Sequence, residues 1–465
     1  MNLKFYFKRI NAVLIVLLFC NTSFAQVTNP SDTLANQVKK LSDDLTLLKK
    51  IKITGYIMAQ YQSADSAGIN SFEGGNFAAN VNNRFMLREA RVKFIYEGKL
   101  SQYVFQLDAT EKGVSVKDMY AKFTEPWLKT VSLTIGQMNR PFGFEIGYTP
   151  TDRESPERGR MSQTVLVGER DLGAMITLQA PKTSKLNFLK LEAGLYNGTG
   201  GANAAGTYLE FDNKKDFIGH LSFNKKTKNE KINISGGVSY YNGGWRNGSS
   251  TIYNMGEVVG VKQFIKTTDN AIIGSITKRE YYGVDAQLSM NLPWGNATIR
   301  GEYIFGKQPG TSNSTVSPQT APTTTLNTLT TAKIPNGNYN HTKDTTVNVV
   351  TVTTPAADVY NRNFNGGYFY FVQNIAKTKF QIFAKYDWYD PNTKVSGKQI
   401  GAKGSNLTSA DIKYSTLGLG LGYNWDKNIK LIAYYAIVKN EITLLKGFEH
   451  EIPDNVLTLR VQYKF

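Results

Sequence analysis

The sequence predicts an all-β protein: a transmembrane antiparallel β-barrel of about sixteen strands, preceded by a short helical segment. Apolar and polar residues alternate with period two in many segments of roughly 9–11 residues, the length that a tilted strand needs to cross a membrane. The connections between these segments alternate between long and short. The chain contains 26 Tyr, 25 Phe and 41 Gly, yet its mean hydropathy is −0.33. This composition suits a wall in which only every second residue faces lipid.

The first 25 residues have the three parts of a secretory signal peptide. An apolar run over 12–19 leads to a small-x-small exit at Ser23-Phe24-Ala25, and the basic residues before it are Lys4, Lys8 and Arg9. Cleavage is expected before Gln26. The only cysteine, Cys20, follows Phe19, where a lipidated cysteine would need a small residue, so lipidation is the lesser alternative. Because no later stretch approaches the roughly 20 apolar residues of a membrane helix, membrane residence must come from strands.

Residues 26–50 are expected to form a periplasmic, coiled-coil-like helix. Ser31 and Asp32 can cap its start, and apolar residues recur at spacings of four and three, namely Leu34, Val38, Leu41, Leu45 and Leu48. This is the a/d pattern of a heptad repeat. A helix this short is marginal alone. It therefore either joins protomers, for instance as a homotrimer, or remains one amphipathic helix that lies against the barrel or frays.

The barrel is expected over 51–465, where the period of the apolar pattern changes to two. The expected strands are 51–61, 90–97, 103–109, 115–123, 131–137, 172–180, 187–195, 217–223, 232–240, 282–290, 297–305, 366–373, 380–388, 413–423, 429–437 and 457–465.

The connections between these strands carry an independent signal. The long ones are 62–83, 138–171, 196–216, 241–281, 306–365, 389–412 and 438–456, and short ones lie between them. The connection near 110–114 is short where a long one is due. Bacterial barrels have tight periplasmic turns and extended outer loops, so the long connections are assigned to the outside. The longest loop, 308–357, is rich in Thr, Ser, Asn and Pro and is expected to be mobile or to carry a small hairpin near 347–352.

Aromatic residues gather where strands are expected to end. Trp127, Trp294 and Trp425 fall in short turns, and Tyr61, Tyr196, Tyr240 and Tyr423 close strands. Amphipathic rings favour the depth of the lipid headgroups, so these residues indicate an aromatic belt at each interface.

Motifs for catalysis or for a cofactor are nearly absent, so the chain is not expected to be an enzyme. There is no phosphate-binding loop or zinc motif, and the histidines are His220, His341 and His450. The series Gly418, Gly420 and Gly422 has period two, which indicates close packing on a strand. His220 and Ser222 share the inner face and are expected to be an ordinary polar pair. The formal charge of +17 would suit nucleic acid, but a signal peptide argues against that partner.

Strand parity places a mixed set of charges inside the barrel. If Val92, Phe94 and Tyr96 face lipid, then Arg91 and Lys93 point inward together with Glu89 and Glu97. The same parity turns inward Lys52, Lys122, Lys190, Arg300, Lys385, Lys430, Arg460, Lys464, Asp108, Asp118, Glu192, Asp285, Glu302 and Asp387. This slightly basic wall would attract anions modestly, or it is an ordinary wet lining that passes both signs.

The connection 138–171 concentrates charge of both signs. Its arginines are Arg140, Arg153, Arg158, Arg160 and Arg170, and its acids are Glu145, Asp152, Glu154, Glu157, Glu169 and Asp171. The guanidinium groups would either bind an anion or form local salt bridges that hold the shape of the loop.

The chain resembles the phosphate-selective porin O and P family. The resemblance rests on Phe85-Met86-Leu87-Arg88-Glu89-Ala90-Arg91-Val92-Lys93-Phe94, on Gly136-Gln137-Met138-Asn139-Arg140-Pro141-Phe142-Gly143, on Arg170-Asp171-Leu172-Gly173 and on the closing Tyr463-Lys464-Phe465. It covers the chain after about residue 50. It implies a homotrimer of sixteen-stranded barrels in the outer membrane, with the loop after the fifth strand folded inward to narrow the pore.

The expected function is therefore passive diffusion of small hydrophilic solutes with a mild preference for anions, phosphate being one candidate. The expected pore-tuning cations are Arg88, Arg91, Lys93 and Arg140, and the loop adds Arg153, Arg158 and Arg160. The expected partners are outer-membrane lipid, small anions and further copies of the chain, and no cofactor or metal is expected. The alternatives are a channel specific for sugars or peptides and a plugged structural or adhesive barrel.

Overall fold

The computed structural model of the chain divides into two units, Met1–Ile51 and Lys52–Phe465. The described residues are 39–42, 45, 48–200, 210, 212–316 and 357–465, together with the backbone of 326–334 and 345–353. The expected signal peptide, Leu34, Val38 and the expected cap at Ser31 and Asp32 lie outside the described residues. Described residues 39–42, 45 and 48 are helical, and the side chains of Leu41, Leu45 and Leu48 are exposed.

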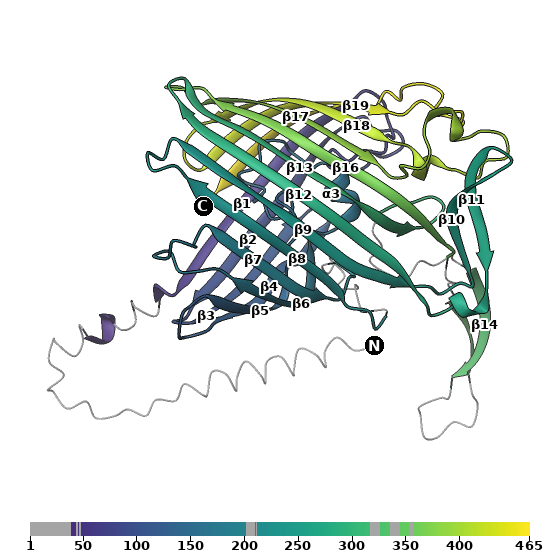
Figure 1. The fold of residues 1–465 in the computed structure, drawn as a ribbon, viewed down its shortest axis with the longest axis horizontal. Helices are drawn as coiled ribbons and strands as arrows, with labels where there is room; N and C mark the ends of the chain where they lie inside the picture. Colours follow the sequence, from purple (N-terminus) through teal and green to yellow (C-terminus); the bar gives the residue numbers. More distant parts are fainter. Residues whose placement is uncertain are drawn as a thin grey trace. The chain divides into compact units, whose positions relative to one another are not determined.

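The second unit is built around a closed antiparallel β-barrel of sixteen wall strands (Figure 1). The strands are β1(Ile51–Ala64), β2(Asn83–Glu97), β3(Ser101–Thr110), β4(Gly113–Thr124), β5(Val131–Asn139), β6(Arg170–Leu178), β7(Leu189–Tyr196), β8(Asp216–Lys226), β9(Ile232–Arg246), β12(Ile276–Leu292), β13(Gly295–Gly310), β16(Val359–Asn374), β17(Phe380–Asp390), β18(Tyr414–Asn424), β19(Ile429–Asn440) and β20(Val456–Lys464). Each overlaps one expected segment, and several extend beyond it by up to seven residues, so the predicted fold class and strand count are confirmed.

The first and last strands close the barrel. β1 pairs with β20 from Tyr56↔Lys464 to Ala64↔Val456. Beyond this register, the Gly55 and Phe465 backbones exchange hydrogen bonds of 3.1 and 3.0 Å. The seam between β1 and β20 therefore leaves no strand edge open, as a barrel in lipid requires.

Side chains alternate between the two faces of the wall, as β20 shows. Leu457, Leu459, Val461 and Tyr463 are 36–51% exposed, whereas Thr458, Arg460 and Gln462 are at most 3% exposed. An apolar outer face around a polar interior is the reverse of a water-soluble fold and matches a lipid environment. Among the described residues, no helix has the length and apolar character to cross a membrane.

A row of glycines makes room for large side chains inside the barrel. A Cβ atom on Gly418 would meet the hydroxyl of Tyr434, and one on Gly420 would meet the ring of Phe383. The rings of Phe383 and Tyr434 stack with centroids 6.0 Å apart. The expectation of close packing along this strand is therefore confirmed for these two glycines.

The connections follow the predicted rhythm, and β3 and β4 are joined by only Glu111 and Lys112. Trp127, Trp294 and Trp425 lie exposed in short turns, as expected for an interface belt. The placement of Tyr196 in that belt was wrong. Its ring is fully buried in an apolar cluster inside the barrel, because Tyr196 has the inward parity of Gly194 and Glu192.

Two of the outer loops carry hairpins. β10(Thr251–Val258) and β11(Val261–Thr268) pair across a turn at Val259 and Gly260, and Ile252 of β10 pairs in parallel with Val359 of β16. This hairpin was not predicted. β14(Leu326–Ile334) pairs with β15(Thr345–Thr353), which confirms a hairpin around 347–352.

The β10–β11 hairpin packs on other outer loops. Its Phe264 contributes to an apolar cluster with Val395, Ile400, Leu407 and Ile412. Short helical turns lie in the connected loops, η1(Asn270–Ile272), η2(Gly397–Gln399) and η3(Ser409–Asp411). The outer loops therefore have a core of their own.

Candidate functional site

The connection from β5 to β6, residues 140–169, folds into the barrel and contains the short helix α3(Arg160–Val165). We call it the inner loop. Its Glu157 carboxylate accepts two hydrogen bonds from Arg88 on β2, at 2.7 and 2.8 Å, and one from Arg460 on β20, at 3.1 Å. The inner loop is thus tied to both sides of the seam between β1 and β20.

The same loop is tied to the other side of the wall. One oxygen of Glu302 on β13 accepts the backbone N–H groups of Phe144 and Glu145 at 3.2 and 2.9 Å. Arg300, also on β13, donates to Glu154 at 2.6 Å. Since all these side chains point inward, the inner loop crosses the lumen, and the predicted inward fold is confirmed.

An apolar core fixes the loop between these ties. Its members from the loop are Phe142, Ile146, Met161, Val165 and Leu166, and its members from the wall include Tyr196, Ile218, Tyr241, Tyr281, Ile304 and Phe364. Burial of this many rings stabilises one arrangement of the loop through packing rather than through charge.

The inner loop reaches far down the barrel beside β20. Thr151 accepts a hydrogen bond from Gln462 at 2.9 Å, and Asp152 lies 3.9 Å from Lys464, next to the end of the chain. The loop begins after Asn139 at the outer end of β5, and it reaches residues near the opposite end of β20.

The first outer loop, 65–82, joins the inner loop. Gln163 donates to the Phe72 carbonyl at 3.0 Å, and Gln62 donates to the Glu73 carbonyl at 2.7 Å. The guanidinium of Arg160 lies 4.4 Å from the ring centre of Phe72. Burial raises the pKa of Glu73 to about 7, because a carboxylate away from water loses its hydration.

The pore-tuning cations expected on the wall, Arg88, Arg91 and Lys93, are each paired with a carboxylate. Arg91 lies 3.2 Å from both Glu89 and Asp108, and Lys93 lies 3.1 Å from Asp118. Arg88 and Glu89 both face the interior although they are consecutive, since Arg88 binds Glu157 and Glu89 accepts from Tyr56. Simple parity would have turned Arg88 outward, and the sequence contains no signal for this local irregularity.

The expected cations of the inner loop have different partners. Arg158 pairs with Glu169, whose pKa is held at about 2 by Arg158 and Arg170 although burial opposes its ionisation. Arg140 donates to the Val167 carbonyl at 2.6 Å.

The remaining two arginines of the loop bind carbonyls and rings. Arg153 donates to the carbonyls of Ser155 and Pro156, and Arg160 lies 3.7 Å from the ring centre of Tyr414. The expected alternative of local salt bridges therefore describes Arg158 and Arg170, which both pair with Glu169, whereas the acids Glu154 and Glu157 bind the wall instead.

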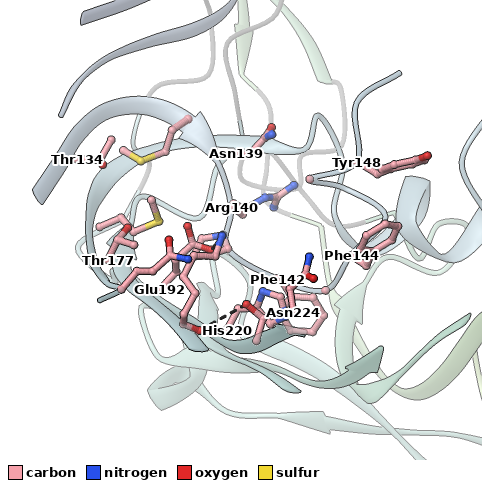
Figure 2. A pocket seen from close by; sticks show the side chains of 18 of the residues that line it. Thr134, Asn139, Arg140, Phe142, Phe144, Tyr148, Thr177, Glu192, His220 and Asn224 are labelled. Carbon is pink, nitrogen blue, oxygen red and sulfur yellow. Dashed lines mark hydrogen bonds and ion pairs between the residues drawn. The ribbon is translucent and has the colours of Figure 1, made fainter. Parts of the chain in front are cut away.

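A chamber of about 670 Å³ lies beside the inner loop (Figure 2). It is lined by residues of β2 to β9 and β12 and by the start of the inner loop, and Figure 2 shows Arg140 and Asn139 on its border. Two ion pairs and one contact between a histidine and a carboxylate line it. They are Lys93 with Asp118 at 3.1 Å, Lys190 with Glu192 at 2.8 Å, and His220 with Asp285 at 3.3 Å.

His220 and Ser222 have the inward placement predicted for them. His220 faces Asp285, and the hydroxyl of Ser222 donates to the Lys190 carbonyl at 3.5 Å. Both line the chamber. Across the residues with placed side chains, no group of three His, Cys, Asp or Glu is arranged to hold a metal.

Comparison with known proteins gives similarity in structure alone. No family model matches the chain, and no curated protein matches it. The outer membrane channel DcaP of Acinetobacter baumannii covers 89% of this chain and 97% of its own at 11% identity, with a TM-score of 0.48. Salmonella typhi OmpF in complex with daunomycin aligns over 89% of this chain and 97% of the OmpF chain at 10% identity, with a TM-score of 0.48. Pseudomonas putida OprB aligns over 92% of this chain and 97% of the OprB chain at 10% identity, with a TM-score of 0.47.

The features of this chain define its class directly. A closed antiparallel barrel with an apolar outer face, a charged interior and a loop folded across the lumen is the architecture of an outer-membrane porin. The chain is a multi-pass β-barrel of the outer membrane.

Proposed function

We propose that the protein is a passive diffusion channel for small hydrophilic solutes with a mild preference for anions. The chamber of about 670 Å³ within the barrel carries this proposal. Its polar and charged lining offers solutes a wet environment inside a wall that is apolar outside.

The anion preference rests on the charges that surround the inner loop. On the inner loop and among the wall groups bonded to it, the cations are Arg88, Arg140, Arg153, Arg158, Arg160, Arg170, Arg300, Lys385, Arg460 and Lys464, and the acids are Glu145, Asp152, Glu154, Glu157, Glu169, Glu302 and Asp387. The cations outnumber the acids, but pairing weakens their field, so the preference is mild.

Phosphate enters the proposal as one permeant anion. A dedicated phosphate site would use two parallel hydrogen bonds from the guanidinium group of an arginine. The guanidinium of Arg88 already donates two such hydrogen bonds to the carboxylate of Glu157, at 2.7 and 2.8 Å. Phosphate would have to displace that carboxylate.

The homotrimer belongs to the same proposal. Leu41, Leu45 and Leu48 are 66%, 49% and 64% exposed within the described part of the N-terminal segment. A helical face of leucines at heptad spacing is buried when helices associate.

Reversal potentials across a planar bilayer test the proposal. In a salt gradient, the purified protein should conduct and give a small potential of the sign for anions. Lys93→Gln should shift the potential towards cations, because it removes a cation that lines the chamber. The matched control is Lys185→Gln, an exposed lysine of the turn between β6 and β7, which should change little.

Two results would contradict the proposal. A clearly cation-selective pore would remove the anion preference while the channel remained. The absence of any conductance would favour a plugged structural barrel, a candidate supported by the dense packing of the inner loop against the wall.

A further inference from the structure

The ionic groups of the chamber largely neutralise each other. Lys93, Lys190 and His220 each lie within 3.3 Å of a carboxylate that also lines the chamber. Arg140 directs its guanidinium to backbone carbonyls. Lys122 has no carboxylate partner among the described residues. A solute in the chamber would therefore meet a weak net charge and many separate hydrogen-bonding groups.

Uncharged polar side chains form an arc along this wall. They are Gln102 on β3, Thr134 and Asn139 on β5, Thr177 on β6 and Asn224 on β8. The side chain of none of them has a hydrogen-bond partner among the described residues, and the Oδ1 atom of Asn139 is buried as well. Amides and hydroxyls both donate and accept hydrogen bonds, which suits neutral ligands with several hydroxyl groups.

Aromatic rings stand on the side of the chamber formed by the inner loop. Phe144 and Tyr148 stack with centroids 5.0 Å apart and an interplanar angle of 29°, and both are half-buried. Figure 2 shows them across the cavity from Thr134 and Thr177. A pyranose ring has an apolar face of C–H groups that packs on aromatic rings, and polar edges that would reach the opposite wall.

We propose that the chamber is a binding subsite for neutral saccharides of two or three sugar units. The proposal rests on the proposed channel function and names a solute class for it. The chamber volume lies in the range of about 300–1,000 Å³ that is usual for small-molecule sites, and a single small ion would leave most of it empty. Hydroxyl groups of the saccharide bind Thr134, Thr177 and the amides, while its apolar faces pack on Phe144 and Tyr148.

Single-channel recording with maltotriose as the probe tests the subsite. The wild-type current should fall in a saturable way as maltotriose is added. The double variant Thr134→Val with Thr177→Val keeps side-chain size and removes two hydroxyls. It should raise the half-blocking concentration about tenfold, because each lost neutral hydrogen bond weakens binding several-fold. Thr416→Val is the matched control, since Thr416 is a buried inward residue of β18 outside the chamber, and it should leave the block unchanged.

A current that falls only in proportion to bulk conductivity would overturn the subsite while the channel function stood. Equal block in the double variant and in the Thr416→Val control would overturn it as well. If the barrel does not conduct, titration calorimetry of the detergent-solubilised protein with maltotriose, and with inorganic phosphate for comparison, measures binding directly. Heat from phosphate alone would refute the proposal, and heat from maltotriose that the double variant weakens would support it.

Discussion

Neutralising Glu157 should release the inner loop from the seam of the barrel. Glu157→Gln keeps the size of the side chain and removes the charge that Arg88 and Arg460 share. The side chains of Glu157 and Arg460 are 3% and 2% exposed, so their pair is buried, and breaking a buried pair costs about 3–5 kcal/mol. Arg88 is 31% exposed and loses less, because water can replace its partner.

The measurement is single-channel recording in planar bilayers. A cost of this size shifts the equilibrium of loop docking by a factor of about 100 or more, so the variant should show larger or noisier open states. Its reversal potential should also move towards anions, because Arg88 and Arg460 keep their charges. Glu97→Gln is the control, since its pair with Lys52 is 40% and 55% exposed. Identical conductance, noise and selectivity in the two variants would refute the claim that Glu157 holds the loop.

Three further predictions concern other parts of the chain. The pKa of Glu73 is raised to about 7, so the stability that it gives to the first outer loop is full below its ordinary pKa and is lost as pH rises through 7. Protease added from outside should cleave that loop faster at about pH 8 than at about pH 5.5, and Glu73→Gln should remove this dependence. Gly420→Ala should lower the thermal unfolding temperature in detergent, because its Cβ atom would meet the ring of Phe383 and overpacking costs about 1–3 kcal/mol. Gly422→Ala, with neighbours at 3.4 Å or more, should not. Leu41→Asp should convert a trimer into monomers on size-exclusion chromatography with light scattering, and an unchanged mass would reject the helix as the oligomerisation element.

The wall of the barrel was predictable because its signal is local. A strand that faces lipid on one side must alternate residue by residue, and β20 shows this from Val456 to Tyr463. The parity rule failed where alternation itself breaks, as at Arg88 and Glu89. Parity alone would have turned Tyr196 inward with Glu192, and the error came from its position at a strand end, which suits an interface belt and a buried cluster equally well.

The hairpin β10–β11 was overlooked although a signal existed. Val259 and Gly260 both have positive φ, 49° and 78°, and a two-residue turn of this kind is the usual link in a tight hairpin. The sequence carries glycine at only one of these positions, and the hairpin lies within a connection that is otherwise polar. Its packing partner Val395 is more than a hundred residues away, so no local pattern reports it.

The sequence predicted which charged residues the candidate site contains, but it did not predict which of them pair with each other. The balance of charges in 138–171 indicated local salt bridges. Glu157, however, binds Arg88 and Arg460, which lie 69 and 303 positions from it in the sequence. Such pairings depend on how the whole barrel closes. The chamber is likewise invisible in the sequence, because it is the space that the inner loop leaves beside β2 to β9 and β12.

The anchoring of the inner loop imposes an order on biogenesis. Glu157 is synthesised before one of its two arginines, Arg460 of β20, so the loop cannot reach its final place until β20 has been made and has paired with β1. A nascent barrel would pass through a stage in which the interior is open and Arg88 and Glu157 lack their full set of partners. Docking of the loop is then the final step of maturation, and it occurs only after β1 and β20 have paired to close the barrel.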